Sequence, residues 1–153
     1  MKIAIVEQRD AYLIERLAQV WESSVRATHT FLSEGDIVEI RDYVPMALQG
    51  VAHLVVAYED DVAVAFMGVE NQRLEMLFVA DDMRGGGIGR RLLEFGIANY
   101  DICEVTVNEQ NPQAVAFYEH LGFKAYRRSE CDEQGRPFPL LYMQLDRSLR
   151  ESE

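Results

Sequence analysis

Hydrophobic and polar residues follow two different periods along this chain, and each change of period marks an expected element. Residues 2–6 form a short β-rich run, which predicts a first strand. After Asp10, apolar residues recur at i, i+3, i+4 and i+7, at Ile14, Leu17, Ala18 and Trp21. That period is typical of one face of an amphipathic helix, and Asp10 suits its N-cap.

A second helical pattern follows a polar and aromatic segment, residues 23–36, which has no clear period. Its apolar residues are Ile37, Ile40, Val44 and Leu48. Ser33 and Asp36 are suited to begin this helix and Gly50 to end it, so we expect one helix here.

Three strand-like runs come next, at residues 51–59, 61–70 and 71–80, and they predict an antiparallel meander. The rest of the pattern predicts, in order, helix 88–100, strand 102–107, helix 112–121 and strands 123–129 and 138–145. The order β-α-α-β-β-β-α-β-α-β-β indicates an α/β fold with a mixed sheet. No repeat or linker divides the chain, so residues 1–153 are expected to form one domain.

The composition and net charge indicate which classes of partner the protein is expected to bind. Hydrophobic residues make up 48% of the 153 residues and charged residues 27%, as in ordinary globular domains. The net charge of −11 disfavours binding to nucleic acid or to an anionic membrane, and it favours a cationic amine substrate. The two cysteines, Cys103 and Cys131, form no CxxC pair and no metal cluster is expected. The beginning of the chain does not look like a signal peptide, so a cytoplasmic location is expected.

The glycine-rich stretch RGGGIGRR, Arg84 to Arg91, lies between an expected strand and an expected helix. Free backbone amides at a helix N-terminus bind anions, and glycines let an oxyanion approach them. The dinucleotide pattern GxGxxG needs a glycine where this chain has Arg90, and the phosphate loop GxxxxGK needs one where it has Arg90 or Arg91. A flexible turn is the alternative interpretation of the glycines.

Two motifs together point to a family. R-x-x-G-x-G is present as Arg84, Gly87 and Gly89, and N-x-x-A-x-x-F-Y-x-x-x-G-F follows at residues 111–123. This pair, in this order, resembles the GCN5-related N-acetyltransferase (GNAT) family. The runs SVRATHTFLS and RSECDEQGRPFPLL are similar to a small bacterial YjaB-like subgroup of it. The resemblance implies a mainly antiparallel mixed sheet with a central, splayed parallel strand pair, here 74–79 and 102–107.

The same resemblance implies acetyl-CoA as the cofactor and assigns its contacts. The pantetheine is expected along the backbone of 77–79 and the pyrophosphate on the loop amides. The expected contacts are Leu77, Phe78, Val79, Arg84, Gly85, Gly86, Gly87, Ile88, Gly89, Arg90, Asn111 and Tyr118. Surface roles are the alternative for the arginines, and a simple N-cap before Pro112 is the alternative for Asn111.

Tyr118 is the expected proton donor to the leaving thiolate, with a core aromatic as the alternative. The general base has two candidates. Glu75 lies in a nearly continuous apolar strand, where its pKa would rise, but it could also be an outward residue paired with Arg73. His29 has a suitable unperturbed pKa, but it could equally be a loop histidine bonded to the backbone. Neither is required if water removes the proton.

The acceptor pocket is expected to be built from the first two helices, their loop and the last hairpin. Its candidate lining residues are Trp21, Ser24, Thr28, His29, Phe31 and Tyr142, although Trp21 also suits a core position. Cys103 lies in a buried strand with no activating group nearby in sequence, so a covalent acetyl-cysteine is not expected.

The expected function is N-acetyl transfer from acetyl-CoA to a primary amine of a small molecule or protein, by direct attack in a ternary complex. A non-catalytic acyl-CoA-binding module is the alternative. An NAD-binding domain is disfavoured by the glycine spacing and by the meander. The sequence does not identify the acceptor amine or whether the chain forms a homodimer.

Overall fold

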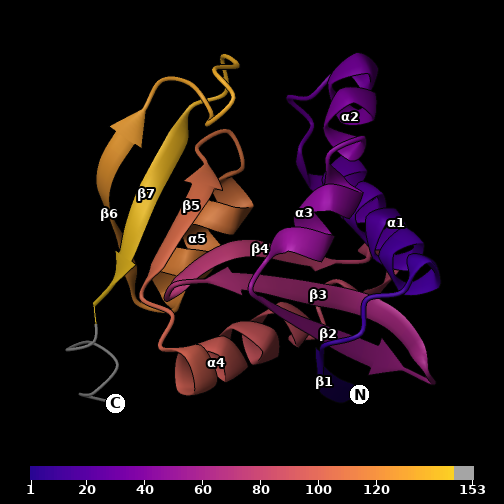
Figure 1. Cartoon of the computed structure of the whole chain (residues 1–153). Helices are drawn as coiled ribbons and strands as arrows, with labels where there is room; N and C mark the ends of the chain where they lie inside the picture. The colour runs from indigo at the N-terminus through magenta and orange to yellow at the C-terminus, as the bar shows by residue number, and fades with distance from the viewer. Residues whose placement is uncertain (147–153) are drawn as a thin grey trace.

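The computed structural model describes residues 1–146 and contains a seven-stranded sheet with the order β1-β2-β3-β4-β5-β7-β6 (Figure 1). The strands are β1 Lys2–Val6, β2 His53–Glu59, β3 Val62–Glu70, β4 Arg73–Val79, β5 Glu104–Asn108, β6 Phe123–Ser129 and β7 Leu140–Leu145. The helices are α1 Ala11–Thr28, α2 Glu34–Arg41, α3 Val44–Gly50, α4 Ile88–Tyr100 and α5 Pro112–His120, with a 3-10 turn at Asp81–Met83.

The sheet is antiparallel except at its centre, where β4 and β5 run parallel. These two strands share only two residue pairs, Arg73–Glu104 and Leu74–Val105. Beyond Leu74 they diverge, and in Figure 1 the strands β5, β7 and β6 stand at an angle to β1–β4. The expected mixed sheet with a splayed parallel pair is therefore confirmed.

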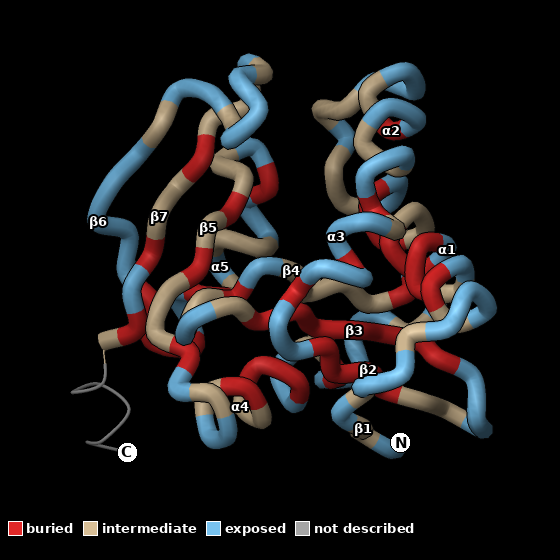
Figure 2. The backbone as a smooth tube through the Cα atoms, in the orientation of Figure 1, coloured by how far each residue is buried: buried red, intermediate tan, exposed pale blue. Residues whose placement is uncertain are grey.

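Two hydrophobic clusters lie on opposite faces of the sheet. Alternate residues of β2 face them: Leu54 and Val56 belong to the cluster under α1, α2 and α3, and Val55 and Ala57 to the cluster under α4 and α5. The period of two along this strand thus supplies both cores. Figure 2 shows the buried backbone concentrated in β2, β3 and the inner side of α1.

The first helix is longer than expected, because the polar segment after Trp21 continues it to Thr28. Val25 lies four residues after Trp21 and is buried with it, so the apolar stripe does not stop. The Thr28 hydroxyl donates to the Ser24 carbonyl at 2.8 Å, a bond that lets threonine remain helical.

The single helix expected up to Gly50 is wrong, because the structure has two, α2 and α3. The beginning of α2 is as expected, since Ser33 and Asp36 form a reciprocal capping box. Pro45 lies in the first turn of α3, where a missing amide hydrogen does no harm. In one continuous helix the same proline would break an internal hydrogen bond, so the chain restarts at Val44.

Among residues 1–146, no helix is both long and apolar enough to cross a lipid bilayer.

Candidate active site

The divergence of β4 and β5 opens a cleft of about 540 Å³, which we call the splay cleft. It is lined by β4 from Leu74 to Val79, by β5 from Val105 to Asn108, by the glycine loop and by the first turns of α5. The sequence motifs at residues 84–89 and 111–118, which lie far apart in the chain, thus face one cavity.

The glycine loop ends in an open helix N-terminus. Gly87 is the N-cap of α4 with φ +80°, and no side chain caps the helix. The amide of Arg91 donates to the Gly87 carbonyl at 3.1 Å. The amides that precede Arg91 have no carbonyl acceptor within the helix. A Cβ added at Gly87 would meet no heavy atom within 4 Å. This uncapped, uncrowded loop fits the pyrophosphate of CoA.

Two arginines of the glycine-rich stretch, Arg84 and Arg90, already have carboxylate partners. Arg84 lies 3.3 Å from Asp81 and donates to Gln113 at 3.4 Å, both long contacts. Arg90 pairs with Glu94 at 2.9 Å along the surface of α4. Both arginines line the splay cleft, and the long Arg84 contacts are the easier ones for a phosphate to replace.

Most of the backbone positions expected to contact the cofactor line the splay cleft, whereas Gly86 does not: Leu77, Phe78, Val79, Gly85, Gly87, Ile88 and Gly89. Because β4 has no partner strand on its β5 side after Leu74, its free edge can pair with an extended ligand.

Asn111 caps α5 and also lines the splay cleft. Its side-chain oxygen accepts from the Ala114 amide at 3.3 Å, which makes it the N-cap of α5. It is also buried and lines the splay cleft. With the oxygen occupied in the cap, its carboxamide nitrogen is the group available to a ligand.

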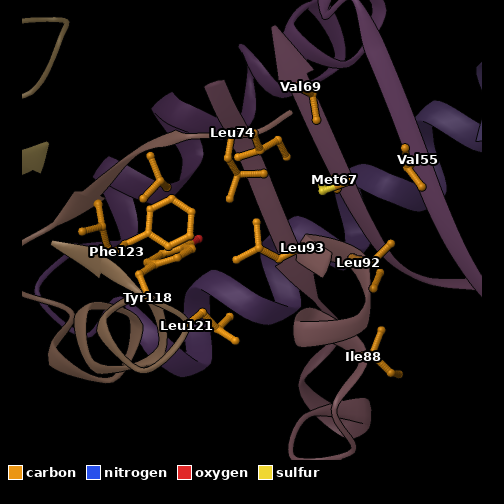
Figure 3. Close-up of a cluster of buried hydrophobic side chains, with 14 of the residues drawn as sticks. Val55, Met67, Val69, Leu74, Ile88, Leu92, Leu93, Tyr118, Leu121 and Phe123 are labelled. Atoms are coloured by element: carbon orange, nitrogen blue, oxygen red, sulfur yellow. The ribbon is translucent and has the colours of Figure 1, made fainter. Parts of the chain in front are cut away.

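Tyr118 is buried in the core beneath the same cleft, with 8% of its surface exposed. Its ring makes edge contacts with Phe117 at 5.2 Å and Phe123 at 5.8 Å. Figure 3 shows Tyr118 beside Phe123 within the cluster that also contains Leu74 and Leu93. Burial raises the pKa of the Tyr118 phenol above its usual value near 10, so the hydroxyl keeps its proton at neutral pH.

Glu75 is placed by a β-bulge. Leu74 pairs with Val69 and Met76 with Gly68, so Glu75 is an extra residue without a partner on β3. The bulge also shifts the alternation of β4: Leu74 packs in the α4–α5 core, while Met76 packs in the α1–α3 core. Burial raises the pKa of the Glu75 carboxyl, Arg73 opposes this, and the charges of Glu133 and Glu70 add to it.

A second hollow of about 310 Å³, which we call the side groove, adjoins the splay cleft at Glu75. His29, Leu74, Glu75, Phe78, Thr106 and Asn108 line both hollows. In the described part of the chain, the side groove contains three acids, Glu75, Asp132 and Glu133, and one permanently charged base, Arg73. The excess of acidic over basic side chains in the side groove favours the binding of a cationic amine.

His29 ends α1 and faces both hollows. Its Nδ1 lies 2.8 Å from the Thr28 hydroxyl oxygen, whose proton is donated to Ser24. The tautomer with the hydrogen on Nδ1 satisfies both contacts of the Thr28 hydroxyl, and in that tautomer Nε2 is a hydrogen-bond acceptor. Burial lowers the pKa of His29 to about 4, so the ring is neutral at pH 7.

The other expected acceptor residues are divided between the hollows and the surrounding structure. Trp21 lines the side groove although it is buried, and Ser24 and Thr28 line the splay cleft. Phe31 lines neither hollow and instead packs between His29 and Phe138, with tilted rings whose centroids lie 5.4 and 5.6 Å apart. Tyr142 also lines neither and lies 4.0 Å from the Arg127 guanidinium.

Sequence reasoning missed Arg73, Thr106 and Glu133 as parts of the site. The sequence indicates Arg73 only as a possible partner of Glu75, and the turn that contains Glu133 carries no chemical motif. Cys103 packs against the α4–α5 core, as expected of a structural thiol. Within residues 1–146, no group of His, Cys, Asp and Glu side chains is arranged to hold a metal ion.

Comparison with known proteins adds independent findings. The acetyltransferase (GNAT) domain matches residues 22–146. The chain is 42% identical over 127 residues to the peptidyl-lysine N-acetyltransferase YjaB of Escherichia coli, covering 83% of this chain and 86% of that protein. The solution structure of apo-form YjaB from Escherichia coli has a TM-score of 0.85 and 40% identity, covering 95% of this chain and 99% of that one.

A more distant structure shares the fold. The PaiA N-acetyltransferase of Thermoplasma acidophilum, solved in complex with coenzyme A, has a TM-score of 0.68 at 22% identity, covering 95% of this chain and 99% of that one.

Proposed function

The chain belongs to the GNAT acetyltransferase family, and on this premise we propose that its acceptor is a lysine side chain of a peptide or protein. The enzyme is an N-acetyltransferase that moves an acetyl group from acetyl-CoA to an amine. The observation that supports a lysine acceptor is the acidic side groove, which opens into the splay cleft at Glu75. A relative that is 42% identical is a peptidyl-lysine N-acetyltransferase.

The splay cleft holds the donor in this proposal. The amides from Gly85 to Arg90 bind the pyrophosphate, assisted by Arg84, and the free edge of β4 at residues 77–79 pairs with the pantetheine. When bound, acetyl-CoA supplies a thioester that an amine can attack and from which a thiolate leaves. The uncapped α4 N-terminus and the unpaired β4 edge support this placement.

Glu75 is the proposed base, because the ammonium of the acceptor must lose a proton before it attacks. Proton transfer to a carboxylate becomes less unfavourable as the carboxyl pKa rises, and the pKa of Glu75 is raised. The lowered pKa of His29 makes that ring a poorer base at neutral pH. We therefore assign His29 to the acceptor pocket, where its ring nitrogen can accept a hydrogen bond. Trp21 and Thr28 line the acceptor pocket in this proposal.

Tyr118 is the proposed hydrogen-bond donor to the leaving sulfur. A phenol with a raised pKa does not give its proton fully to a thiolate whose usual pKa is about 8.5. It can still donate a short hydrogen bond to the sulfur as charge develops there, which stabilises the transition state more than the ground state. Its buried position on α5 limits competing water.

A screen for acetyl-CoA thiol release tests this assignment. Lysine peptides, free lysine, polyamines and aminoglycosides are compared, and mass spectrometry locates the acetyl group. Lysine peptides should show the highest kcat/KM. A small amine used at least tenfold better would overturn the lysine acceptor. Thermal stabilisation by acetyl-CoA without turnover of any amine would instead favour a non-catalytic acyl-CoA-binding module.

The cellular setting completes the proposal. A single catalytic domain over residues 1–153 that acts in the cytoplasm would encounter both acetyl-CoA and lysine-bearing proteins. The net charge of −11 supports a protein acceptor over nucleic acid or an anionic membrane as the partner.

A further inference from the structure

Arg73 stands at the point where the two parallel strands part. It begins β4, and its register partner is Glu104 of β5. Its Nη2 donates to the Thr106 hydroxyl at 2.6 Å and to the Glu133 carboxylate at 2.8 Å. One end of the guanidinium is therefore fixed to both β5 and the β6–β7 loop.

The Nε–H on the other side of the same guanidinium makes no hydrogen bond within residues 1–146. In the described part of the chain, Arg73 Nε is the one buried side-chain nitrogen or oxygen without a hydrogen-bond partner. The nearest carboxylate oxygen in an ion pair with it is Glu75 Oε1, 3.6 Å away. A buried donor left unpaired costs about 1–3 kcal/mol, and a movement of roughly 0.7 Å would bring this oxygen within hydrogen-bond distance.

Glu75 has the freedom to make that movement. As the extra residue of the bulge, it has no partner on β3, so the strand ladder does not fix the direction of its side chain. Arg73 is two residues before it and lies in the same hollow. The fixed guanidinium and the unfixed carboxylate form an asymmetric pair.

We propose that Arg73 is a positioning residue for acetyl transfer, holding the Glu75 carboxylate at the junction of the two hollows through its otherwise unpaired Nε–H. The proposal rests on the proposed function, because it assumes that Glu75 takes the proton of the acceptor amine. Arg73 touches neither reacting group. It acts through the orientation and the charge of Glu75.

The charged groups around Glu75 determine what removing Arg73 would do. Burial raises the pKa of Glu75, Arg73 lowers it, and the charges of Glu133 and Glu70 raise it. Asp132 also lines the side groove, and His29 is neutral at pH 7. Without Arg73, every remaining influence favours the protonated carboxyl, so less of the base is available at neutral pH.

Three variants test the proposal with acetyl-CoA and a lysine peptide: Arg73→Met, Arg73→Lys and Glu75→Gln. In Arg73→Met we expect kcat/KM to fall roughly tenfold at pH 6.5, because the rising limb of its pH profile moves to higher pH. The difference in kcat/KM between this variant and the unmodified enzyme should therefore be smaller at pH 9. Arg73→Lys restores the charge without the forked geometry and should return the limb most of the way toward its original position. Stabilisation by acetyl-CoA should be unchanged in all three, which checks folding.

A second readout needs no turnover. Carbon-13 NMR titration of the glutamate carboxyls, with the Glu75 signal identified by its loss in Glu75→Gln, reports the Glu75 pKa directly. It should rise in Arg73→Met and return toward the original value in Arg73→Lys. An unchanged titration, or a rising limb that coincides with that of the unmodified enzyme, overturns the proposal for Arg73.

The outcomes separate this proposal from the proposed function. If Glu75→Gln retains full activity, Glu75 is not the base and the role of Arg73 in acetyl transfer fails with it. If Glu75→Gln is inactive while Arg73→Met keeps both the pH profile and the Glu75 titration, only the positioning role fails. If lysine peptides are not acetylated but the titration shifts as expected, the lysine acceptor fails and the Arg73–Glu75 coupling stands.

Discussion

Acid should lower the free energy of unfolding of this protein through the titration of one histidine, His29. Its pKa is lowered to about 4 in the folded state by burial, against 6.5 in its ordinary state. At pH 7 the ring is neutral in both the folded and the unfolded chain. As the pH falls from 6.5 toward 4, the unfolded chain binds a proton that the folded chain does not, so the free energy of unfolding decreases.

The size of this effect follows from the two pKa values. Between pH 7 and pH 4.5, the His29 contribution should cost about 2 kcal/mol of unfolding free energy. The loss from this group levels off well below pH 4, where the ring is protonated in both states. For a protein of marginal stability, that loss is a substantial part of the total.

Urea unfolding at pH 7 and pH 4.5 measures it, with His29→Gln as the comparison. Glutamine keeps a polar side chain but does not titrate, so the acid-induced loss in the variant should be smaller by about 2 kcal/mol. Contributions from carboxylates common to both proteins cancel in the difference. The exposed His120→Gln variant serves as the control and should keep the acid sensitivity of the unmodified protein. Equal losses in the unmodified protein and His29→Gln would refute the argument that His29 is buried as a neutral ring.

Three further predictions concern the cofactor loop, the proposed hydrogen-bond donor to the leaving sulfur, and the core. Acetyl-CoA should raise the melting temperature, and Gly87→Ala should reduce that rise, because φ +80° disfavours any side chain and alanine would shift the loop backbone that presents the amides. Gly50→Ala, in open space away from the cleft, should leave the rise intact. Tyr118→Phe should lower kcat at least tenfold while the acetyl-CoA Kd from calorimetry stays within about twofold, and equal kcat would remove Tyr118 as the sulfur's hydrogen-bond donor. Gly96→Ala should reduce the free energy of unfolding measured in urea by about 1–3 kcal/mol, because the added Cβ would press against Ile102 and Met67. This cost should exceed the gain from alanine's better helix propensity, so a stabilised variant would contradict the close packing at Gly96.

The period of apolar residues was enough to predict most of the fold. It gave the strands and the later helices, and the capping chemistry of Asp10 and Ser33 was confirmed at the beginnings of α1 and α2. The period did not predict helix ends that depend on tertiary packing or on a single residue. Val25 extends α1, and Pro45 divides the expected second helix. Periodicity alone did not predict the splayed pair, which came from the resemblance.

The site was predictable only where one continuous segment carries it. The glycine loop and the segment around Tyr118 are such segments, and both line the splay cleft. The arrangement around Glu75 is different, because a bulge leaves no mark in an apolar run and its effect depends on the partner strand β3. Arg73 meets Thr106 and Glu133 across 33 and 60 residues, through pairings that local sequence does not encode.

The order of strands β5, β7 and β6 has a consequence for the growth of the chain on the ribosome. β6 is made before β7 but lies outside it, and β7 occupies the place between β5 and β6. Until residues 140–145 emerge, β6 has no strand to pair with, and β5 is joined to the sheet by only two residue pairs. The N-terminal meander can assemble early, whereas the half that carries β5 and the wall behind Tyr118 must wait for the last strand. A nascent chain therefore acquires its catalytic centre only after β7 has emerged.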